Sequence, residues 1–170
     1  MTTHHSQKGF TLLELLLYIA VLSFVLLAMM TLFNLLIEVR TKNRVQGEVY
    51  MQGQLVMYEF NRIIKDSSDI SLPSNGSSTT SATLSHPTVQ KNPIKITLDG
   101  SKIFIQEGSS PAIAVTNNSV TVTNLTFRNL TRPNTNGNIQ YSFTLSGANG
   151  TGRNEFNYST TFYGGASLRQ

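Results

Sequence analysis

The sequence predicts an α+β fold in which one long N-terminal α-helix packs on a C-terminal antiparallel β-sheet. No proline occurs from Phe10 to Asp66, and in that stretch only Gly47 and Gly53 weaken a helix. Beyond Pro73 the apolar residues change from helical spacing to alternation, which is the period of a β-strand. The chain has 170 residues and no cysteine, so we expect one globular domain, with or without a membrane segment, and no disulfide.

The first part of the predicted helix, residues 10–37, is apolar on every side. Glu14 is the one charged residue in this run. About 28 helical residues span roughly 42 Å, which exceeds the hydrocarbon core of about 30 Å. We therefore predict that residues 10–37 form a transmembrane helix.

Residues 38–70 are predicted to continue the same helix in amphipathic form. Apolar residues recur there at spacings of three, four and seven, which places them on one face. Pro73 ends any helix by that point. The residues of this apolar stripe, which would lie on the sheet, are Val45, Val49, Val56, Phe60, Ile63 and Ile64.

Residues 71–90 are rich in serine and threonine and contain Pro73 and Pro87. Few of their side chains could bury apolar area, so we predict a long, mobile surface loop.

The remaining residues, 91–170, are predicted to form the antiparallel sheet. Alternating apolar residues at 94–98 and 103–105 flank Asp99-Gly100, which is a strong hairpin signal. Three further strands are expected at residues 120–127 with an irregularity at Asn124, at 139–145, and at 156–162 with an end at Gly164-Gly165, and a short extra strand at 112–115. One face of this sheet would lie on the helix.

The segment Lys8-Gly9-Phe10-Thr11-Leu12-Leu13-Glu14 resembles the processing site of type IV prepilins and pseudopilins. In that family a membrane peptidase cuts after the glycine and methylates the new N-terminal residue. The resemblance implies a leader peptide at residues 1–9, cleavage between Gly9 and Phe10, and N-methylation of Phe10. It covers the first third of the chain closely, and the remainder in general layout.

Thr11, Leu12, Leu13 and Glu14 are the candidate assembly residues. Thr11-x-x-Glu14 is also a capping-box pattern, in which the glutamate accepts a hydrogen bond from a free N–H at a helix start. The resemblance implies that Glu14 pairs with the N-terminal amine of a neighbouring subunit and sets the register of a filament. An unpaired carboxylate at membrane depth costs about 2.5–3.5 kcal/mol, so such a pair would favour assembly.

The charges around the apolar run and the resemblance predict opposite orientations. Lys8 precedes the run, whereas Arg40, Lys42 and Arg44 follow it, so positive-inside counting alone places the C-terminal side in the cytoplasm. The resemblance implies the reverse. We adopt it and predict a single-pass protein of the cytoplasmic (inner) membrane that passes into an extracellular or periplasmic filament.

No other group of residues in the sequence predicts a catalytic or metal-binding site. His4, His5 and His86 do not form a metal set, and Asp66 and Asp69 lack the alternating oxygen ligands of a calcium loop. No nucleophile, base and orienting group stand in a recognisable pattern. We therefore expect no enzyme activity, metal, cofactor or small-molecule substrate.

A DNA-binding surface is an alternative that we weigh and do not favour. The formal net charge is +4, too small to indicate a nucleic-acid partner without a focused patch. A face that collected the basic residues of the body could bind DNA phosphates, but a scattered, solvated surface is our interpretation of Lys91, Lys95, Lys102, Arg128, Arg132 and Arg153.

We accordingly predict a structural subunit, a minor pilin of a type IV pilus or competence-type filament. A prepilin peptidase would process it, and its N-terminal helix would pack against other pilin subunits. Two alternatives stay open: a pseudopilin of a type II secretion-like system, and a binding domain anchored by a single membrane span that never assembles.

Overall fold

The computed structural model describes residues 11–148 and 157–169 of the chain. Its contacts divide the chain into two units, Met1–Arg40 and Thr41–Gln170. The first unit contributes the beginning of a single helix, and the second contains the remainder of that helix and all the described strands.

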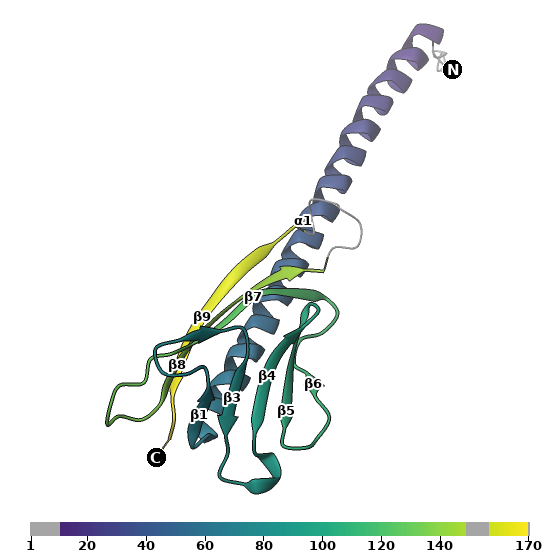
Figure 1. The fold of residues 1–170 in the computed structure, drawn as a ribbon. Coiled ribbons are helices and arrows are strands. Elements are labelled where there is room, and N and C mark those ends of the chain that lie inside the picture. Colours follow the sequence, from purple (N-terminus) through teal and green to yellow (C-terminus); the bar gives the residue numbers. More distant parts are fainter. Residues whose placement is uncertain (1–10, 149–156, 170) are drawn as a thin grey trace, which may run out of the picture. The chain divides into compact units, whose positions relative to one another are not determined.

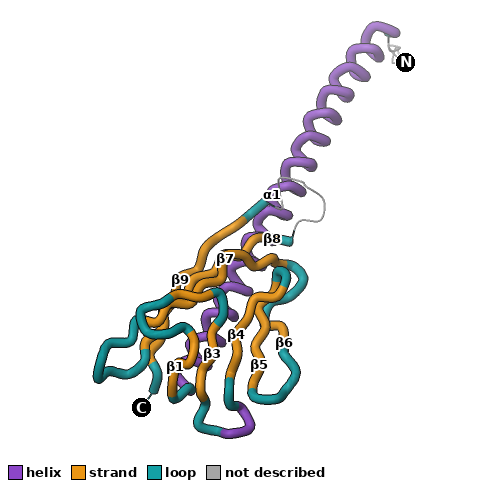
Figure 2. Tube along the Cα trace, in the orientation of Figure 1, coloured by secondary structure: helices purple, strands orange, loops and turns teal. Residues whose placement is uncertain are grey.

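The helix α1 runs from Leu12 to Asp66, close to the range that the sequence predicts (Figure 2). It ends where Ser67 turns its hydroxyl back and donates to the carbonyl oxygen of Ile63 at 2.7 Å. That bond occupies one of the carbonyl groups that a helix end leaves without a partner.

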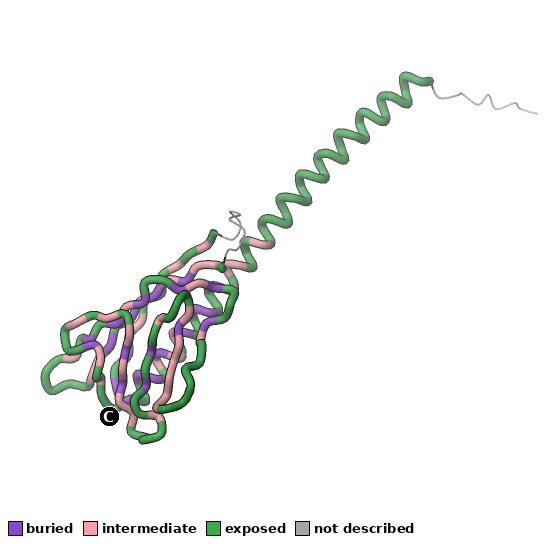
Figure 3. Tube along the Cα trace, turned by 45° about the vertical axis from the view of Figure 1, so that its right-hand side comes forward, coloured by how far each residue is buried: buried purple, intermediate pink, exposed green. Residues whose placement is uncertain are grey.

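Within the second unit, α1 buries one face and exposes the other. Figure 3 shows buried positions recurring along this part of the helix. The buried residues follow the predicted amphipathic stripe and add two small or polar members: Val49, Gln52, Gly53, Val56, Phe60, Ile63 and Ile64.

The described strands form two antiparallel sheets, whereas the sequence pattern predicts one. The five-stranded sheet has the order β1-β3-β4-β5-β6. Its strands are β1 (Asp69–Leu72), β3 (Ala82–Ser85), β4 (Ile94–Asp99), β5 (Lys102–Glu107) and β6 (Ile113–Ala114). The predicted hairpin is confirmed as β4 and β5, with Gly100 at a φ of 60° in the turn, and β6 matches the predicted short strand.

The four-stranded sheet has the order β2-β7-β8-β9. Its strands are β2 (Ser78–Thr79), β7 (Val120–Asn129), β8 (Asn138–Gly147) and β9 (Ser159–Ser167). The irregularity expected at Asn124 is confirmed, because this residue has a φ of 55° and the β7–β8 register shifts between Thr123 and Thr126. A β-bulge of this kind leaves the extra residue unpaired and increases the local twist.

The predicted loop at 71–90 needs correction. That segment holds the end of β1, the strands β2 and β3, and a 3₁₀ turn at Val89–Lys91 (Figure 1). Ala82 and Leu84 point into the core from β3, which pairs on both sides. Two buried residues in a short strand produce little apolar signal among many serines and threonines, and the sheet supplies the backbone partners that a loop would lack.

The predicted end of the last strand is also wrong. β9 continues through Gly164 and Gly165 to Ser167. A Cβ atom on Gly164 would lie 2.4 Å from the ring of Tyr141, so glycine is what lets this strand pass over the buried ring. Phe156, expected at the start of the strand, lies outside the described residues.

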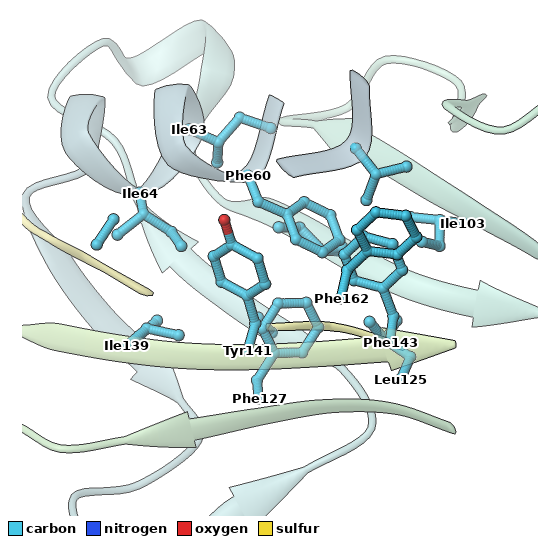
Figure 4. Close-up of a cluster of buried hydrophobic side chains, with 14 of the residues drawn as sticks. Phe60, Ile63, Ile64, Ile103, Leu125, Phe127, Ile139, Tyr141, Phe143 and Phe162 are labelled. Atoms are coloured by element: carbon cyan, nitrogen blue, oxygen red, sulfur yellow. The ribbon is translucent and has the colours of Figure 1, made fainter. Parts of the chain in front are cut away.

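The core of the second unit lies between α1 and the sheets. Figure 4 shows Phe60 of α1 directed towards aromatic side chains of the four-stranded sheet. Its ring centroid lies 5.3 Å from that of Phe127 and 5.1 Å from that of Tyr141, the latter in an edge-to-face arrangement. Phe143 and Phe162 stack at 5.3 Å beside them. Ring pairs at these separations contribute about 0.5–1.5 kcal/mol each beyond their burial.

Candidate functional site

The start of α1 carries the residues that the sequence singles out. Thr11 precedes the first helical residue, and its Oγ1 accepts a hydrogen bond from the backbone N–H of Glu14 at 3.3 Å. The carbonyl oxygen of Thr11 accepts the first helical bond, from Leu15 N–H, at 3.2 Å. Thr11 is therefore the N-cap of the helix, as the capping-box pattern predicts.

The carboxylate of Glu14 has a different hydrogen-bond partner from the one that a capping box supplies. The hydroxyl of Tyr18 donates to Glu14 Oε1 at 3.3 Å. Tyr18 follows Glu14 by four residues and so lies on the same helix face. Tyr18 is not among the site residues predicted from the sequence, although its spacing of four residues from the lone carboxylate was a usable signal. In an apolar medium such a donor offsets part of the cost of the charge.

Leu12 and Leu13 belong to a large apolar surface that none of the described residues buries. Each is 78% exposed, and no described residue up to Arg40 is buried. Soluble proteins rarely expose contiguous apolar patches larger than a few hundred Å², so a surface of this kind is covered by lipid or by other protein.

Two hydroxyl side chains within this apolar run bond to the backbone of the helix itself. Ser23 Oγ donates to the carbonyl oxygen of Ile19, and Thr31 Oγ1 donates to that of Ala28, both at 2.8 Å. Hydroxyls satisfied in this way do not need water. Among the described residues, α1 is the one helix long and apolar enough to cross a membrane.

The predicted cleavage site, Gly9 and Phe10, lies outside the described residues. Of the predicted site residues, the structure places Thr11 at the N-cap of α1 and Leu12, Leu13 and Glu14 on its first turn.

The histidine and aspartates considered as metal ligands have other surroundings. His86 Nδ1 accepts a hydrogen bond from Thr88 N–H at 3.0 Å, within a turn. Asp66 is the last residue of α1, and Asp69 is the first of β1. Within residues 11–148 and 157–169 no three His, Cys, Asp or Glu side chains lie close enough together to hold a metal ion. His4 and His5 precede that part of the chain.

The described basic residues of the body lie on several different elements. Arg153 lies outside the described residues. Lys91 forms an ion pair with Glu107 at 3.2 Å, and Lys102 contacts Asn118 Oδ1. Lys95 lies on β4 of one sheet and Arg128 on β7 of the other. On α1, the hydrogen bond to Glu59 raises the pKa of Arg62, with an N–O distance of 2.7 Å.

A groove in the described part of the body is lined mainly by polar residues, and hydrogen bonds within the protein occupy part of its wall. It has a volume of about 840 Å³ and lies beside the C-terminal end of α1. Asn129, in its wall, donates to the carbonyl oxygen of Pro73 at 2.9 Å and accepts from Thr131 N–H at 3.0 Å. These bonds use the side-chain amide within the protein.

One comparison with known proteins bears on this site. Residues 4–30 match the family model described as the prokaryotic N-terminal methylation motif, a range that includes the predicted cleavage site and the first turns of α1. No curated protein and no solved structure matches the chain. The match supports a type IV pilin-like prepilin that prepilin peptidase processes, without distinguishing a minor pilin from a pseudopilin.

Proposed function

We propose that this chain, whose N-terminal segment carries the methylation motif of type IV pilin-like prepilins, is a minor pilin of a type IV pilus or competence-type filament. One observation carries the proposal. The first turns of α1 expose an uninterrupted apolar surface with a single carboxylate, Glu14, one turn after the expected cleavage site.

A charge in this position is costly in a membrane and useful in an assembly. After cleavage, Phe10 would carry an α-ammonium group about one helical turn from Glu14. A neighbouring helix that brings its own N-terminal amine to Glu14 would recover part of the roughly 2.5–3.5 kcal/mol cost of the carboxylate. The apolar residues around it would then exchange lipid contacts for helix–helix contacts.

The role that we propose is structural and non-enzymatic. Residues 10–37 would hold the subunit in the cytoplasmic membrane before assembly and would pack in the filament core afterwards. The residues from Thr41 onwards would form the exposed body of the subunit. We carry the pseudopilin of a secretion machine as the alternative, because the same helix start supports it equally.

The first experiment is mass spectrometry of sheared surface filaments and of the membrane fraction. An N-methylated peptide that begins at Phe10, found in the sheared fraction, is the expected result. The same peptide confined to the membrane fraction would favour the pseudopilin. An uncut peptide containing Lys8-Gly9-Phe10, in cells with active prepilin peptidase, would contradict the proposal and favour an anchored binding domain.

A substitution tests the role of Glu14 itself. We expect Glu14→Ala to insert and to be cleaved, but to enter filaments about tenfold less, because half of the roughly 3 kcal/mol cost would no longer be recovered on assembly. Glu38→Ala, which removes a carboxylate just beyond the apolar run, is the matched control and should assemble normally. Unchanged incorporation of Glu14→Ala would rule out the register role.

A further inference from the structure

The outer edge of β9 is the longest free strand edge in the described part of the chain. The order of the four-stranded sheet ends at β9, which Figure 1 shows in yellow at the outside of the sheet. The other sheet edges are β2 and β6, with two residues each, and β1, with four residues and a register shift. Short or irregular edges of that kind resist pairing with other chains.

Two hydrogen bonds fix which backbone groups of β9 point outwards. Gly147 N–H donates to the carbonyl oxygen of Tyr158 at 3.0 Å, and Leu168 N–H donates to that of Gly137 at 2.8 Å. The register between β8 and β9 continues unbroken between these two pairs. Because an antiparallel ladder alternates, the even-numbered residues of β9 face β8 and the odd-numbered residues face away from it.

The outward-facing backbone groups have no partner in the described part of the chain. No hydrogen bond given by residues 11–148 and 157–169 uses the N–H or C=O of the odd-numbered residues of β9. Their side chains are exposed and uncharged: Ser159, Thr161, Tyr163, Gly165 and Ser167. β9 also contains no proline. The strand thus lacks the charges and prolines with which exposed edges are usually protected.

A face of α1 lies alongside this edge and presents aromatic side chains. The ring of Tyr50 lies 6.0 Å from that of Tyr158 and 6.2 Å from that of Phe162, and it is 50% exposed. Tyr58, which is 65% exposed, shares a groove of about 650 Å³ with Ser167 at the other end of β9. The core-facing side chains of one more strand would therefore meet Tyr50 and Tyr58.

The charge at the C-terminal end of the edge is mainly positive. The same groove is lined by the cations Arg62, Lys65 and Arg169, and by one carboxylate, Asp66, among the described residues. Arg62 already pairs with Glu59. The positively charged side chains of Lys65 and Arg169 therefore make this end of the edge suitable for binding an acidic group.

We propose that the free edge of β9 accepts an additional strand from a partner protein. The partner segment is extended and amphipathic, with apolar side chains that pack on Tyr50 and Tyr58 and an acidic residue that reaches Lys65 and Arg169. Its backbone completes the hydrogen bonds of the odd-numbered residues of β9, which is the β-augmentation mode of recognition. Antiparallel pairing, the more stable arrangement, places the acidic residue at the N-terminal end of the partner segment.

The test uses the full chain in detergent micelles and the peptide acetyl-Asp-Thr-Val-Thr-Val-Thr-Val-Thr-amide. In the added strand its threonine N–H groups face β9 and its valines face α1. We expect saturating peptide to slow amide hydrogen exchange about tenfold or more at Thr161, Tyr163 and Gly165, with no change at Phe162. The same peptide N-methylated at its threonines should not bind, because it cannot donate to the edge.

Two substitutions at one position separate backbone pairing from side-chain contact. Thr161→Pro removes an outward N–H, and Thr161→Ala keeps it, while both lose the hydroxyl contact with Thr144. We expect the proline variant to bind the peptide at least about tenfold more weakly than the alanine variant. Retained exchange protection at Phe162 would establish that the proline variant is folded.

Four results would overturn the proposal. Slow exchange of the odd-numbered amides before peptide is added would mean that the edge is already covered. Equal binding of the N-methylated peptide, or no effect of the unmodified peptide, would exclude backbone pairing. Because the chain has no cysteine, Tyr163→Cys supplies a unique thiol, and its rapid disulfide formation with a second copy would indicate self-pairing of β9 in place of a partner strand.

Discussion

Burial is the main influence on the ionisation of the Tyr141 phenol. Its ring lies beside Phe60 and Phe127, and its hydroxyl donates to Asn61 Oδ1 at 2.9 Å, within 3.3 Å of the carbonyl oxygen of Met57. Burial raises the pKa of Tyr141 to about 12, and the hydrogen bond to Asn61 opposes part of that shift. The phenol therefore stays protonated in the folded protein at pH values where a free tyrosine ionises.

Alkaline pH should destabilise the fold through this residue. An unfolded tyrosine titrates near pH 10, so between about pH 10 and 12 the unfolded chain binds fewer protons than the folded chain. The ionisation of Tyr141 therefore leaves the free energy of unfolding unchanged below about pH 10, and it lowers that free energy as the pH rises through this window. We expect Tyr141→Phe to lose about 1 kcal/mol at neutral pH and to flatten this alkaline decline. Denaturant unfolding at pH 8 to 12 measures both effects, and the exposed Tyr163→Phe, which should change neither, is the control.

Thr11 tests the N-terminal cap of α1. Thr11→Val keeps the side-chain shape and removes the oxygen that accepts from Glu14 N–H. We expect amide exchange at Glu14 to become about fivefold faster, which corresponds to the roughly 1 kcal/mol contribution of an N-cap. Exchange measured by NMR in micelles should be restored by Thr11→Ser. Equal exchange in all three proteins would show that Thr11 does not cap the helix.

At the scale of elements, two glycines of α1 have opposite surroundings. A Cβ atom on Gly53 would lie 2.1 Å from the ring of Phe162, which is buried and stacked on Phe143, whereas one on Gly47 would meet nothing within 4 Å. Gly53 therefore lets β9 approach the helix closely. Gly47 has no such contact.

The two alanine substitutions should change stability in opposite directions. Gly53→Ala should destabilise the body by about 1–3 kcal/mol, because the added methyl group overpacks the contact with Phe162. Gly47→Ala should stabilise the helix by up to about 1 kcal/mol through its greater helix propensity. Thermal unfolding of the two variants provides the comparison. A neutral Gly53→Ala would mean that Phe162 can move aside.

The strand β3 shows at the same scale where sequence patterns mislead. Ala82 and Leu84 are its two buried residues, and although they alternate at strand spacing, no third apolar residue extends the pattern on either side. Their burial depends on pairing with β1 and β4. Local composition carries no information about that pairing.

At the scale of the whole molecule, the two units need different environments to bury their apolar residues. The residues up to Arg40 are exposed throughout the described part, whereas the core cluster begins at Val49 and draws all its members from the second unit. The body therefore holds a complete apolar core of its own, and the first unit needs a lipid or protein environment.

A fragment that contains residues 41–170 tests this division. We expect it to fold cooperatively and to remain soluble without detergent, because it keeps the whole core cluster and loses the apolar run. Its melting temperature should lie within about 4 °C of the transition of the full chain in micelles, the shift that about 1 kcal/mol produces in a domain of this size. Circular dichroism measures both transitions. Aggregation or non-cooperative melting of the fragment would show that the body needs the first unit.

Several features of this protein follow from its sequence alone. Local sequence patterns were sufficient to predict four features: α1, its N-cap at Thr11, the hairpin at Asp99-Gly100 and the irregularity at Asn124. Each depends on residues that are neighbours in the chain, because helix capping, turn geometry and apolar periodicity act over one or two turns. The motif at the start of α1 is local in the same sense.

Other features were decided by the tertiary structure, because they depend on contacts between residues that are distant in the chain. The division into two sheets, the burial of Leu84 and the continuation of β9 past Gly164 all require strands that are far apart in the chain. Gly164 reads as a strand end in the sequence, and only the ring of Tyr141 beneath it shows why a glycine lies inside a strand there. The free edge of β9 is likewise a property of strand order. A strand's own residues determine that it can pair, but the fold determines which of its edges is left without a partner.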